Sequence, residues 1–330
     1  MALRTILADP LLRLLCLAMV LAALIPAQGE WRSAAQMVAN IGIFLLFLAN
    51  GMRVARAEIA AGAKNLRFFV PLALWIFGAM SVAGLALAHA AQTFLPPLIA
   101  LGFLYLGTLT TTVQSSTSYS SLAGGNVALS VIAAASMSIL GVFVSVPVFL
   151  ALGGSGDGMV GSDALVKIVM ILILPFAIGQ AIQTRTASFI ARQRQAVVWL
   201  DRLVIAFAVY VAFSGAVEQG LWERVDIAGW GLTLGFVGLF LLVGHLGAWA
   251  LSGGLKMARA DRIAFLFAGA QKSAAIGAPL ATVLFPPEAA GFVVLPLVLY
   301  HFLQLVIAAP IATRLSLASP SDCDGPTTRS

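Results

Sequence analysis

Charged residues are scarce in this sequence. Only 10% of its 330 residues are Asp, Glu, Lys or Arg, whereas 61% are hydrophobic and the mean hydropathy is +1.01. A soluble globular domain has about a quarter of its residues charged, so this composition excludes a soluble protein. Apolar runs of about 20 residues, the length that spans a bilayer, recur along the chain. The sequence therefore predicts an all-α, multi-pass membrane protein.

Cysteine and histidine are also rare. Cys16 lies within the first apolar run and Cys323 in the polar C-terminal segment, so we expect no intramolecular disulfide. His89, His245 and His301 fall in separate apolar runs without the spacing of metal ligands, and we expect them to be buried or interfacial. No pattern predicts a cofactor, although sodium stays open as a bound ion.

A catalytic constellation is missing. The loop from Gly153 to Asp157 contains Gly-x-Ser-Gly and Gly-x-Gly-Asp, which are similar to short patterns of intramembrane proteases. Both lie in one glycine-rich loop rather than at the end of a buried helix. The second aspartate that an acid dyad needs within the membrane does not exist. A flexible linker explains this loop better, and we expect the protein not to be an enzyme.

Carboxylates are absent from the middle of the apolar runs. All 13 Asp and Glu residues fall in the expected loops or at the ends of these runs. Proton pumps and many cation-coupled carriers place an Asp or Glu within the membrane. Coupling through such a carboxylate is therefore excluded.

The apolar runs predict ten membrane spans. If the N-terminus is cytoplasmic, most Lys and Arg residues fall on the cytoplasmic side, and only Arg32 and Arg224 fall in the outer loops. This asymmetry predicts two cytoplasmic termini in a bacterial inner membrane. The first run also resembles a signal peptide, but its removal would spoil the repeat described below. The predicted spans are 11–26, 35–51, 68–90, 97–122, 127–152, 164–183, 197–217, 227–252, 262–284 and 291–314.

Ten spans divide into two sets of five, and an odd number per set predicts inverted repeats. The first repeat is 1–152 and the second is 164–314, with an outer loop at 153–163 and a tail at 315–330 that we expect to be disordered. Inverted repeats are the usual plan of secondary transporters. Their binding sites form where a broken helix from each half meets near the middle of the membrane.

A polar block interrupts the fourth span. Nine of the twelve residues from Thr110 to Ser121 are Ser or Thr, and such a segment survives at membrane depth only against protein or water. One or two hydroxyls would bond back to their own helix, but nine predict half of a binding site. The repeat places the other half in the ninth span, where Gln271, Lys272 and Ser273 stand among small residues.

Lys272 has the greatest weight in this prediction. An ammonium near the centre of a span costs several kcal/mol unless it is paired or hydrated, so its partners must be hydroxyls, carbonyls, water or an anionic substrate. Snorkelling is the alternative, but Lys272 lies ten residues from Arg262, which is about 15 Å of helix. Lys167 lies near the outer end of its span, where snorkelling is sufficient, and a role for it stays open.

Two segments resemble the bile acid:sodium symporter superfamily. They are Thr112 to Ser130, with its Val-Gln-Ser-Ser motif, and Ala268 to Leu280, with Gln-Lys-Ser. The likeness extends over about residues 10–315 and is closest to the SBF-like branch, which is related to the seventh member of solute carrier family 10. It implies a panel domain of spans 1, 2, 6 and 7 and a core domain of spans 3–5 and 8–10. In the core, discontinuous helices 4 and 9 cross.

The resemblance also implies that the sodium site of this superfamily is incomplete here. Sodium-coupled members use a Ser-Asn pair, a Ser and a Thr on the next span, and a Glu in the second broken helix. The corresponding residues in this sequence are Ser116, Thr117, Ser130, Ala134 and Phe267. At a second sodium site Gln271 remains, but Lys272 stands where those members have Asn. We hypothesise that the Lys272 ammonium replaces a bound cation.

The function that these patterns favour is secondary active transport of a small organic anion by alternating access, without sodium. Three alternatives stay open: a sodium-coupled bile-acid-type symporter, proton coupling through Lys272, because burial favours the neutral form of a lysine, and a non-transporting sensor that binds ligand in the same cavity. The expected partners are the lipid bilayer and the anion, and no nucleic acid. The predicted substrate- or ion-binding residues are Gln114, Ser115, Ser116, Thr117, Ser130, Gln271, Lys272 and Ser273, of which Ser116, Thr117, Ser130 and Gln271 are remnant sodium-site positions.

Overall fold

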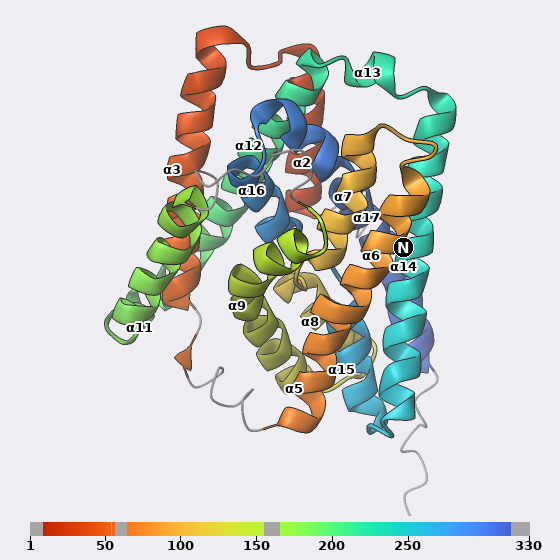
Figure 1. Cartoon of the computed structure of the whole chain (residues 1–330). Helices are drawn as coiled ribbons and strands as arrows, with labels where there is room; N and C mark the ends of the chain where they lie inside the picture. Colours follow the sequence, from red (N-terminus) through yellow and green to blue (C-terminus); the bar gives the residue numbers. More distant parts are fainter. Residues whose placement is uncertain (1–8, 54, 57–64, 155–165, 318–330) are drawn as a thin grey trace, which may run out of the picture.

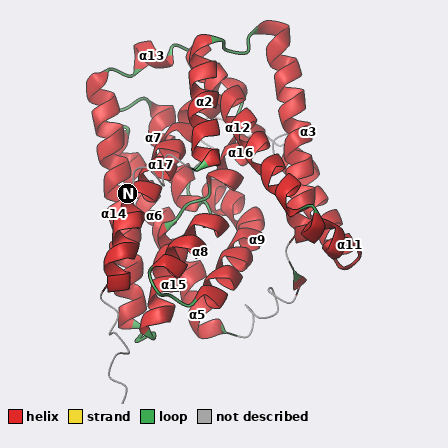
Figure 2. Cartoon of the chain, turned by 180° about the vertical axis from the view of Figure 1, so that it is seen from behind, coloured by secondary structure: helices red, strands yellow, loops and turns green. Residues whose placement is uncertain are grey.

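The protein is built from helices (Figure 1). The computed structural model describes residues 9–53, 55–56, 65–154 and 166–317, and within these ranges there is no strand. Eight of the described helices are long and apolar enough to cross a membrane, or up to nine if the bent pair α7 and α8 is one span. A shorter apolar helix, α2, comes in addition. Figure 2 shows the same helices from behind, joined mostly by short loops. The prediction of an all-helical, multi-pass membrane protein is confirmed.

The helices of the first half begin close to the predicted spans. Asn126 caps α9, because its side chain accepts a hydrogen bond from the backbone N–H of Leu129 at 3.0 Å. Asp9 caps α2 in the same way, through the N–H groups of Leu11 and Leu12. In chain order the elements are α2 (Pro10–Leu24), α3 (Gly29–Arg53), α5 (Leu66–Ala73), the π-helical segment η1 (Leu74–Ala79), α6 (Met80–Ala91), α7 (Pro97–Thr108), α8 (Val113–Leu122) and α9 (Val127–Ala151).

The second half of the described chain starts with a helix over Val166–Arg192. This helix contains a second π-helical segment, η3, just before Pro175, whose missing N–H interrupts regular α-helical pairing. The elements here are η3 (Val169–Ile173), α11 (Leu174–Arg192), α12 (Arg194–Glu218), α13 (Leu221–Arg224), α14 (Ile227–Gly254), α15 (Arg259–Ala270), α16 (Ala274–Leu284) and α17 (Pro287–Leu317).

The helices pack as two groups. In the first group α3 packs against α11, and α12 packs against α2 and α3. α3 and α11 approach closely where Gly51 meets Gly179, because neither residue has a side chain to separate the backbones. In the second group α7 lies between α6 and α17, and α8 lies between α9 and α15. α12 connects the groups through α16 and α17.

Burial differs sharply between the helices. In the 18-residue apolar stretch of Arg259–Leu284, 89% of the residues are buried, whereas in that of α14 only 33% are buried. α15 and α16 are therefore surrounded by protein, as a helix at the centre of the second group must be.

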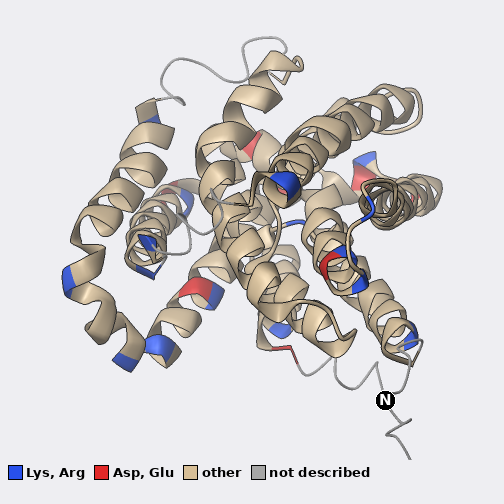
Figure 3. Cartoon of the chain, turned by 90° about the horizontal axis from the view of Figure 1, so that it is seen from below, with Lys and Arg blue, Asp and Glu red and all other residues tan. Residues whose placement is uncertain are grey.

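The charged residues of the protein avoid the middle of the helices. Seen from below, Lys and Arg lie mostly at helix ends and in loops, and they outnumber Asp and Glu in this view (Figure 3).

Candidate functional site

Two helical segments are interrupted near each other. α7 and α8 are bent by 62° at a break of four residues, Leu109 to Thr112. α15 and α16 are separated by Gln271, Lys272 and Ser273, which are not helical. The break between α7 and α8 lies at the start of the polar block that was predicted from the sequence, and the rest of that block lies in α8. The break between α15 and α16 lies at the predicted residues Gln271, Lys272 and Ser273. Each break exposes backbone N–H and C=O groups that need partners, because no water is available in the hydrocarbon core.

The two breaks supply many of these partners to each other. The backbone N–H of Ser273 donates to the carbonyl of Thr110 at 2.9 Å. The hydroxyl of Thr112 donates to the carbonyl of Lys272 at 2.8 Å. Nearby, the Tyr105 hydroxyl of α7 donates to the carbonyl of Gly277 in α16 at 2.6 Å. The breaks are therefore locked together into one unit, which we call the crossing (residues 107–113 and 270–274).

The ammonium of Lys272 lies inside the crossing. The residue is 0% exposed. Its Nζ donates to the carbonyls of Leu109 at 2.7 Å, Gly107 at 2.8 Å and Ile76 at 3.3 Å. An ammonium has three N–H donors and no acceptor, so these carbonyls satisfy it completely. Of the partners that the sequence left open, the structure selects backbone carbonyls.

The three carbonyls are available for local structural reasons. Gly107 and Leu109 lie at the C-terminal end of α7, where carbonyls have no partner in the helix and the helix dipole is negative. Ile76 lies in η1, where the π-helical geometry changes the regular backbone pairing. Gly84 lets α6 approach α7 at Gly107, because a Cβ on Gly84 would lie 2.6 Å from the carbonyl oxygen of Phe103. A cation-binding cradle results from backbone geometry alone.

The backbone of Lys272 is held from the other side by α17. The side-chain amide of Gln304 accepts from the N–H of Lys272 at 2.8 Å and donates to its carbonyl at 3.1 Å. The Gln304 amide also contacts Nδ1 of His301 at 2.8 Å. The Tyr300 hydroxyl donates to the carbonyl of Ala270 at 2.6 Å. The sequence analysis missed Gln304, although a lone amide within a long apolar run is a signal that could have found it.

The predicted site residues take up different positions. Ser115 contacts Gln271 across the crossing, with its hydroxyl 2.9 Å from Oε1 of the amide. Ser273 caps α16 by accepting from the N–H of Ile276 at 3.2 Å. Gln114 is exposed on α8. The structure therefore brings together Ser115, Gln271, Lys272 and Ser273.

The side chains at the remnant sodium positions make different contacts. The hydroxyls of Ser116 and Thr117 donate back to the carbonyl of Val113, at 3.3 Å and 2.8 Å. The buried hydroxyl of Ser130 and the buried amide nitrogen of Gln271 have no partner among the described residues.

The position that the resemblance assigns to a carboxylate holds an aromatic ring. Phe267 is fully buried, and the centre of its ring lies 5.9 Å from that of Tyr119. In the described part of the chain, no cluster of three or more His, Cys, Asp or Glu residues has the arrangement of a metal site. The donor set at the crossing thus consists of neutral oxygens and one built-in cation, Lys272.

Comparison with known proteins gives consistent matches over most of the chain. The sequence model of the SBF-like CPA transporter family matches residues 9–317. The PA2026 protein of Pseudomonas aeruginosa is 37% identical over 297 residues, which is 89% of each chain. YfeH of Escherichia coli strain K12 is 33% identical over 314 residues, or 93% of this chain and 92% of YfeH. Sodium/bile acid cotransporter 7 of Mus musculus is 21% identical over 290 residues, or 82% of this chain and 81% of the mouse protein.

Proposed function

The chain belongs to the SBF-like CPA transporter family, and from this premise we propose that it is a sodium-independent secondary carrier of a small organic anion. The name of the mouse relative, sodium/bile acid cotransporter 7, supports an organic anion as the substrate class. One observation carries the proposal beyond the family. A lysine ammonium, fully buried and donating to three carbonyls, occupies the crossing of the broken helices.

This ammonium has the charge of a bound sodium ion and makes similar contacts. Both cations interact with carbonyl oxygens, and both compensate the negative C-terminal end of a helix. Lys272 does so while attached to the chain. The three carbonyls of Gly107, Leu109 and Ile76 match the three N–H donors of the protonated amine in number. We infer that the tethered cation removes the need for a dissociable one.

A sodium ion added to this site would meet an unfavourable environment. Phe267 is an apolar aromatic residue and supplies no negative charge to compensate the ion. A second cation near Lys272 would also be repelled, and repulsion is strong in a medium of low dielectric constant. These features argue against the alternative of a sodium-coupled symporter.

An anion, in contrast, finds favourable groups at the crossing. α8 begins at Val113 and α16 begins at Ala274, so the positive ends of two helix dipoles start at the two breaks. α8 also carries polar side chains that are exposed in the protein, including Gln114, Ser118 and Ser121. At membrane depth such side chains must face water or a ligand. We infer that this face of α8 lines the route of the substrate.

The helix packing supports a moving-body mechanism. We propose ten spans in two inverted sets of five, with both termini on the cytoplasmic side of a bacterial inner membrane. α2, α3, α11 and α12 form the panel domain, and the helices from α5 to α9 and from α14 to α17 form the core domain, in agreement with the two packing groups. Alternating access then consists of movement of the core, with its crossing intact, against the panel.

Counterflow in proteoliposomes tests transport itself. The purified protein is reconstituted, loaded with an unlabelled anion and diluted into the labelled anion, using a steroid carboxylate, a small monocarboxylate and a phosphate ester in separate assays. We expect transient accumulation of at least one labelled anion and none in protein-free liposomes. A ligand-binding regulator gives a thermal-shift response to an anion but no counterflow of the same anion, and that result would reject the proposal.

A further inference from the structure

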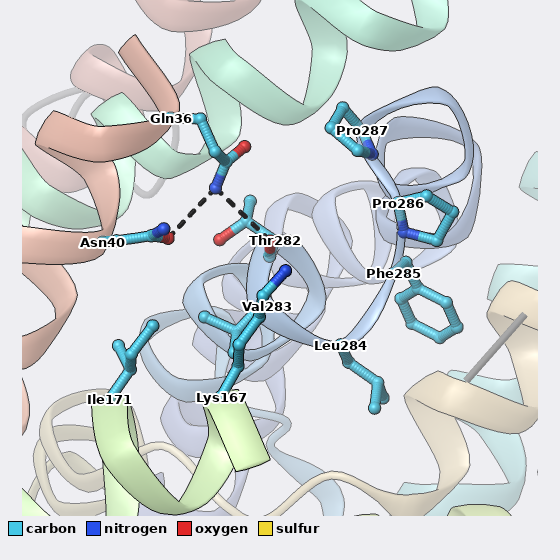
Figure 4. A pocket seen from close by; sticks show the side chains of 10 residues that line it. All are labelled: Gln36, Asn40, Lys167, Ile171, Thr282, Val283, Leu284, Phe285, Pro286 and Pro287. Carbon is cyan, nitrogen blue, oxygen red and sulfur yellow. Dashed lines mark hydrogen bonds between the residues drawn. The ribbon is translucent and has the colours of Figure 1, made fainter. Parts of the chain in front are cut away.

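A cavity lies apart from the crossing, between the two helix groups. It has a volume of about 380 Å³, which lies within the range of small-molecule sites. α3 contributes Gln36 and Asn40, the start of the Val166–Arg192 helix contributes Lys167, and the end of α16 contributes Thr282 (Figure 4). The turn between α16 and α17 completes the lining. In this view the side chain of Lys167 extends into the cavity, toward the side where the other polar groups lie.

Lys167 is the only charged residue that lines this cavity among the described residues. It forms no ion pair within the described ranges, because the salt bridges found there involve only Arg32 and Arg53. A second hollow, lined by Gln36, Asn40 and Arg32 among others, adjoins the first. The Arg32 charge in it is already compensated by Glu218 and Glu288. Among the described residues that line the cavity, the uncompensated charge is therefore positive.

The hydrogen-bond donors of the cavity also favour an anion. The amide nitrogen of Gln36 is occupied, because it donates to Oδ1 of Asn40 at 3.1 Å and to the carbonyl of Thr282 at 3.4 Å. This arrangement fixes the Asn40 amide with its oxygen toward Gln36. The Asn40 amide nitrogen and the Lys167 ammonium donate no bond to the described residues. Two donors, one of them charged, thus remain for a ligand.

We propose that this cavity is a binding site for a carboxylate anion, to which Lys167 and Asn40 donate hydrogen bonds. A carboxylate has two acceptor oxygens and can take one bond from each donor. Ile171 and Val283 provide apolar surface for the remainder of the molecule. Lys167 is exposed at the start of its helix, and its side chain extends into the cavity.

The position of the site gives it a role in transport. This role rests on the proposed function. Its walls come from α3 and the start of the Val166–Arg192 helix in one group and from α16 in the other. A movement of the core against the panel would change its shape, so the site would be formed in one state of the cycle. We infer that it is the entry site of the anion at the end of the protein opposite to the cytoplasmic face.

Thiol labelling of the purified protein tests the site without a transport assay. Cys16→Ser and Cys323→Ser remove the native thiols, and Ile171→Cys places a reporter thiol on the cavity wall. Its reaction rates with an anionic sulfonatoethyl and a cationic trimethylammonioethyl methanethiosulfonate are then compared. Adding Lys167→Gln should lower the anionic-to-cationic rate ratio by about tenfold, which is typical of local electrostatic attraction. Lys256→Gln, the same change at an exposed residue between α14 and α15, should leave the ratio unchanged.

Benzoate and its neutral analogue benzamide test binding itself. With a Kd of about 1 mM, about 10 mM benzoate should slow labelling of the reporter roughly tenfold, whereas benzamide should not. Asn40→Ala should weaken this protection. Equal protection by both compounds, or a rate ratio insensitive to Lys167→Gln, would overturn the site. Either result would leave counterflow by the wild type, and therefore the proposed function, unaffected.

Discussion

At the scale of single residues, the crossing depends on side chains that hold the backbone. Gln304 is fully buried and pairs with both the N–H and the carbonyl of Lys272. Gln304 thus provides the two backbone hydrogen bonds that a continuous helix would provide to Lys272. Its position therefore controls where the Lys272 ammonium lies.

Gln304→Leu keeps the side-chain volume similar but leaves the two backbone groups of Lys272 without a partner. Each unpaired buried group costs about 1–3 kcal/mol, so we expect a clearly lower melting temperature in detergent and slower anion counterflow. Gln193→Leu, at an exposed amide in the turn before α12, is the matched control and should leave both unchanged. A Gln304→Leu protein with wild-type melting temperature and counterflow would contradict this role.

Several site residues were predictable from composition, whereas the carbonyls that hold Lys272 were not. The Ser and Thr content from Thr110 to Ser121 and the lone charge at Lys272 are conspicuous in an apolar sequence. The first begins at the break before α8 and continues into α8, and the second lies at the break before α16. The cradle of Lys272 was not predictable, because carbonyls of Gly107, Leu109 and Ile76 belong to the backbone and leave no mark in the sequence. Only the fold brings them together.

At the scale of elements, the break between α7 and α8 needs space on the neighbouring helix. Gly141 of α9 provides it, since a Cβ there would lie 2.5 Å from Cβ of Thr110. Thr110 in turn donates its hydroxyl to the carbonyl of Met137 at 2.6 Å. The surface of α9 at Gly141 and Met137 thus packs against the non-helical backbone at Thr110.

Gly141→Ala should therefore destabilise the protein, although alanine is normally favoured over glycine in a helix by about 1 kcal/mol. The control is Gly235→Ala in α14, where an added Cβ meets nothing within 4 Å, and it should be neutral or slightly stabilising. The melting temperature of Gly141→Ala should fall, whereas that of Gly235→Ala should stay constant or rise slightly. A shift of both in the same upward direction would show that Gly141 is not needed for close packing.

Most element boundaries followed the apolar pattern, but α3 begins six residues before the predicted span 35–51, and α11 ends nine residues after the predicted span 164–183. The predicted fourth span, 97–122, has the outer bounds of α7 and α8, and the predicted ninth, 262–284, lies within α15 and α16. The π-helical segments η1 and η3 were not predicted, because one turn of π-helix does not change the apolar composition of a span. The last helix extends to Leu317, three residues beyond the predicted end of its span.

At the scale of the whole molecule, the account requires the two helix groups to move against each other. The side-chain amide of Gln36 in α3 donates to the backbone carbonyl of Thr282 in α16 at 3.4 Å, so these two residues join the groups beside the cavity. A covalent link between them would hold the groups in one arrangement.

Gln36→Cys with Thr282→Cys, in the background without native cysteines, should lose counterflow on reaction with a short bifunctional methanethiosulfonate and regain it on reduction. Arg53→Cys with Asp201→Cys is the control, because it links α3 to α12 within one group, where Nη1 of Arg53 lies 2.8 Å from Oδ2 of Asp201. This variant should retain counterflow when it is cross-linked. Undiminished counterflow in the cross-linked Gln36 and Thr282 variant would contradict movement between the groups.

Transport by the whole molecule is proposed to depend on Lys272, which replaces a dissociable cation. The most direct measurement is the initial rate of anion uptake into proteoliposomes as external potassium is replaced by sodium at constant ionic strength and membrane potential. We expect the wild-type rate to stay constant across the series. A rate that rises and saturates with sodium would contradict the claim.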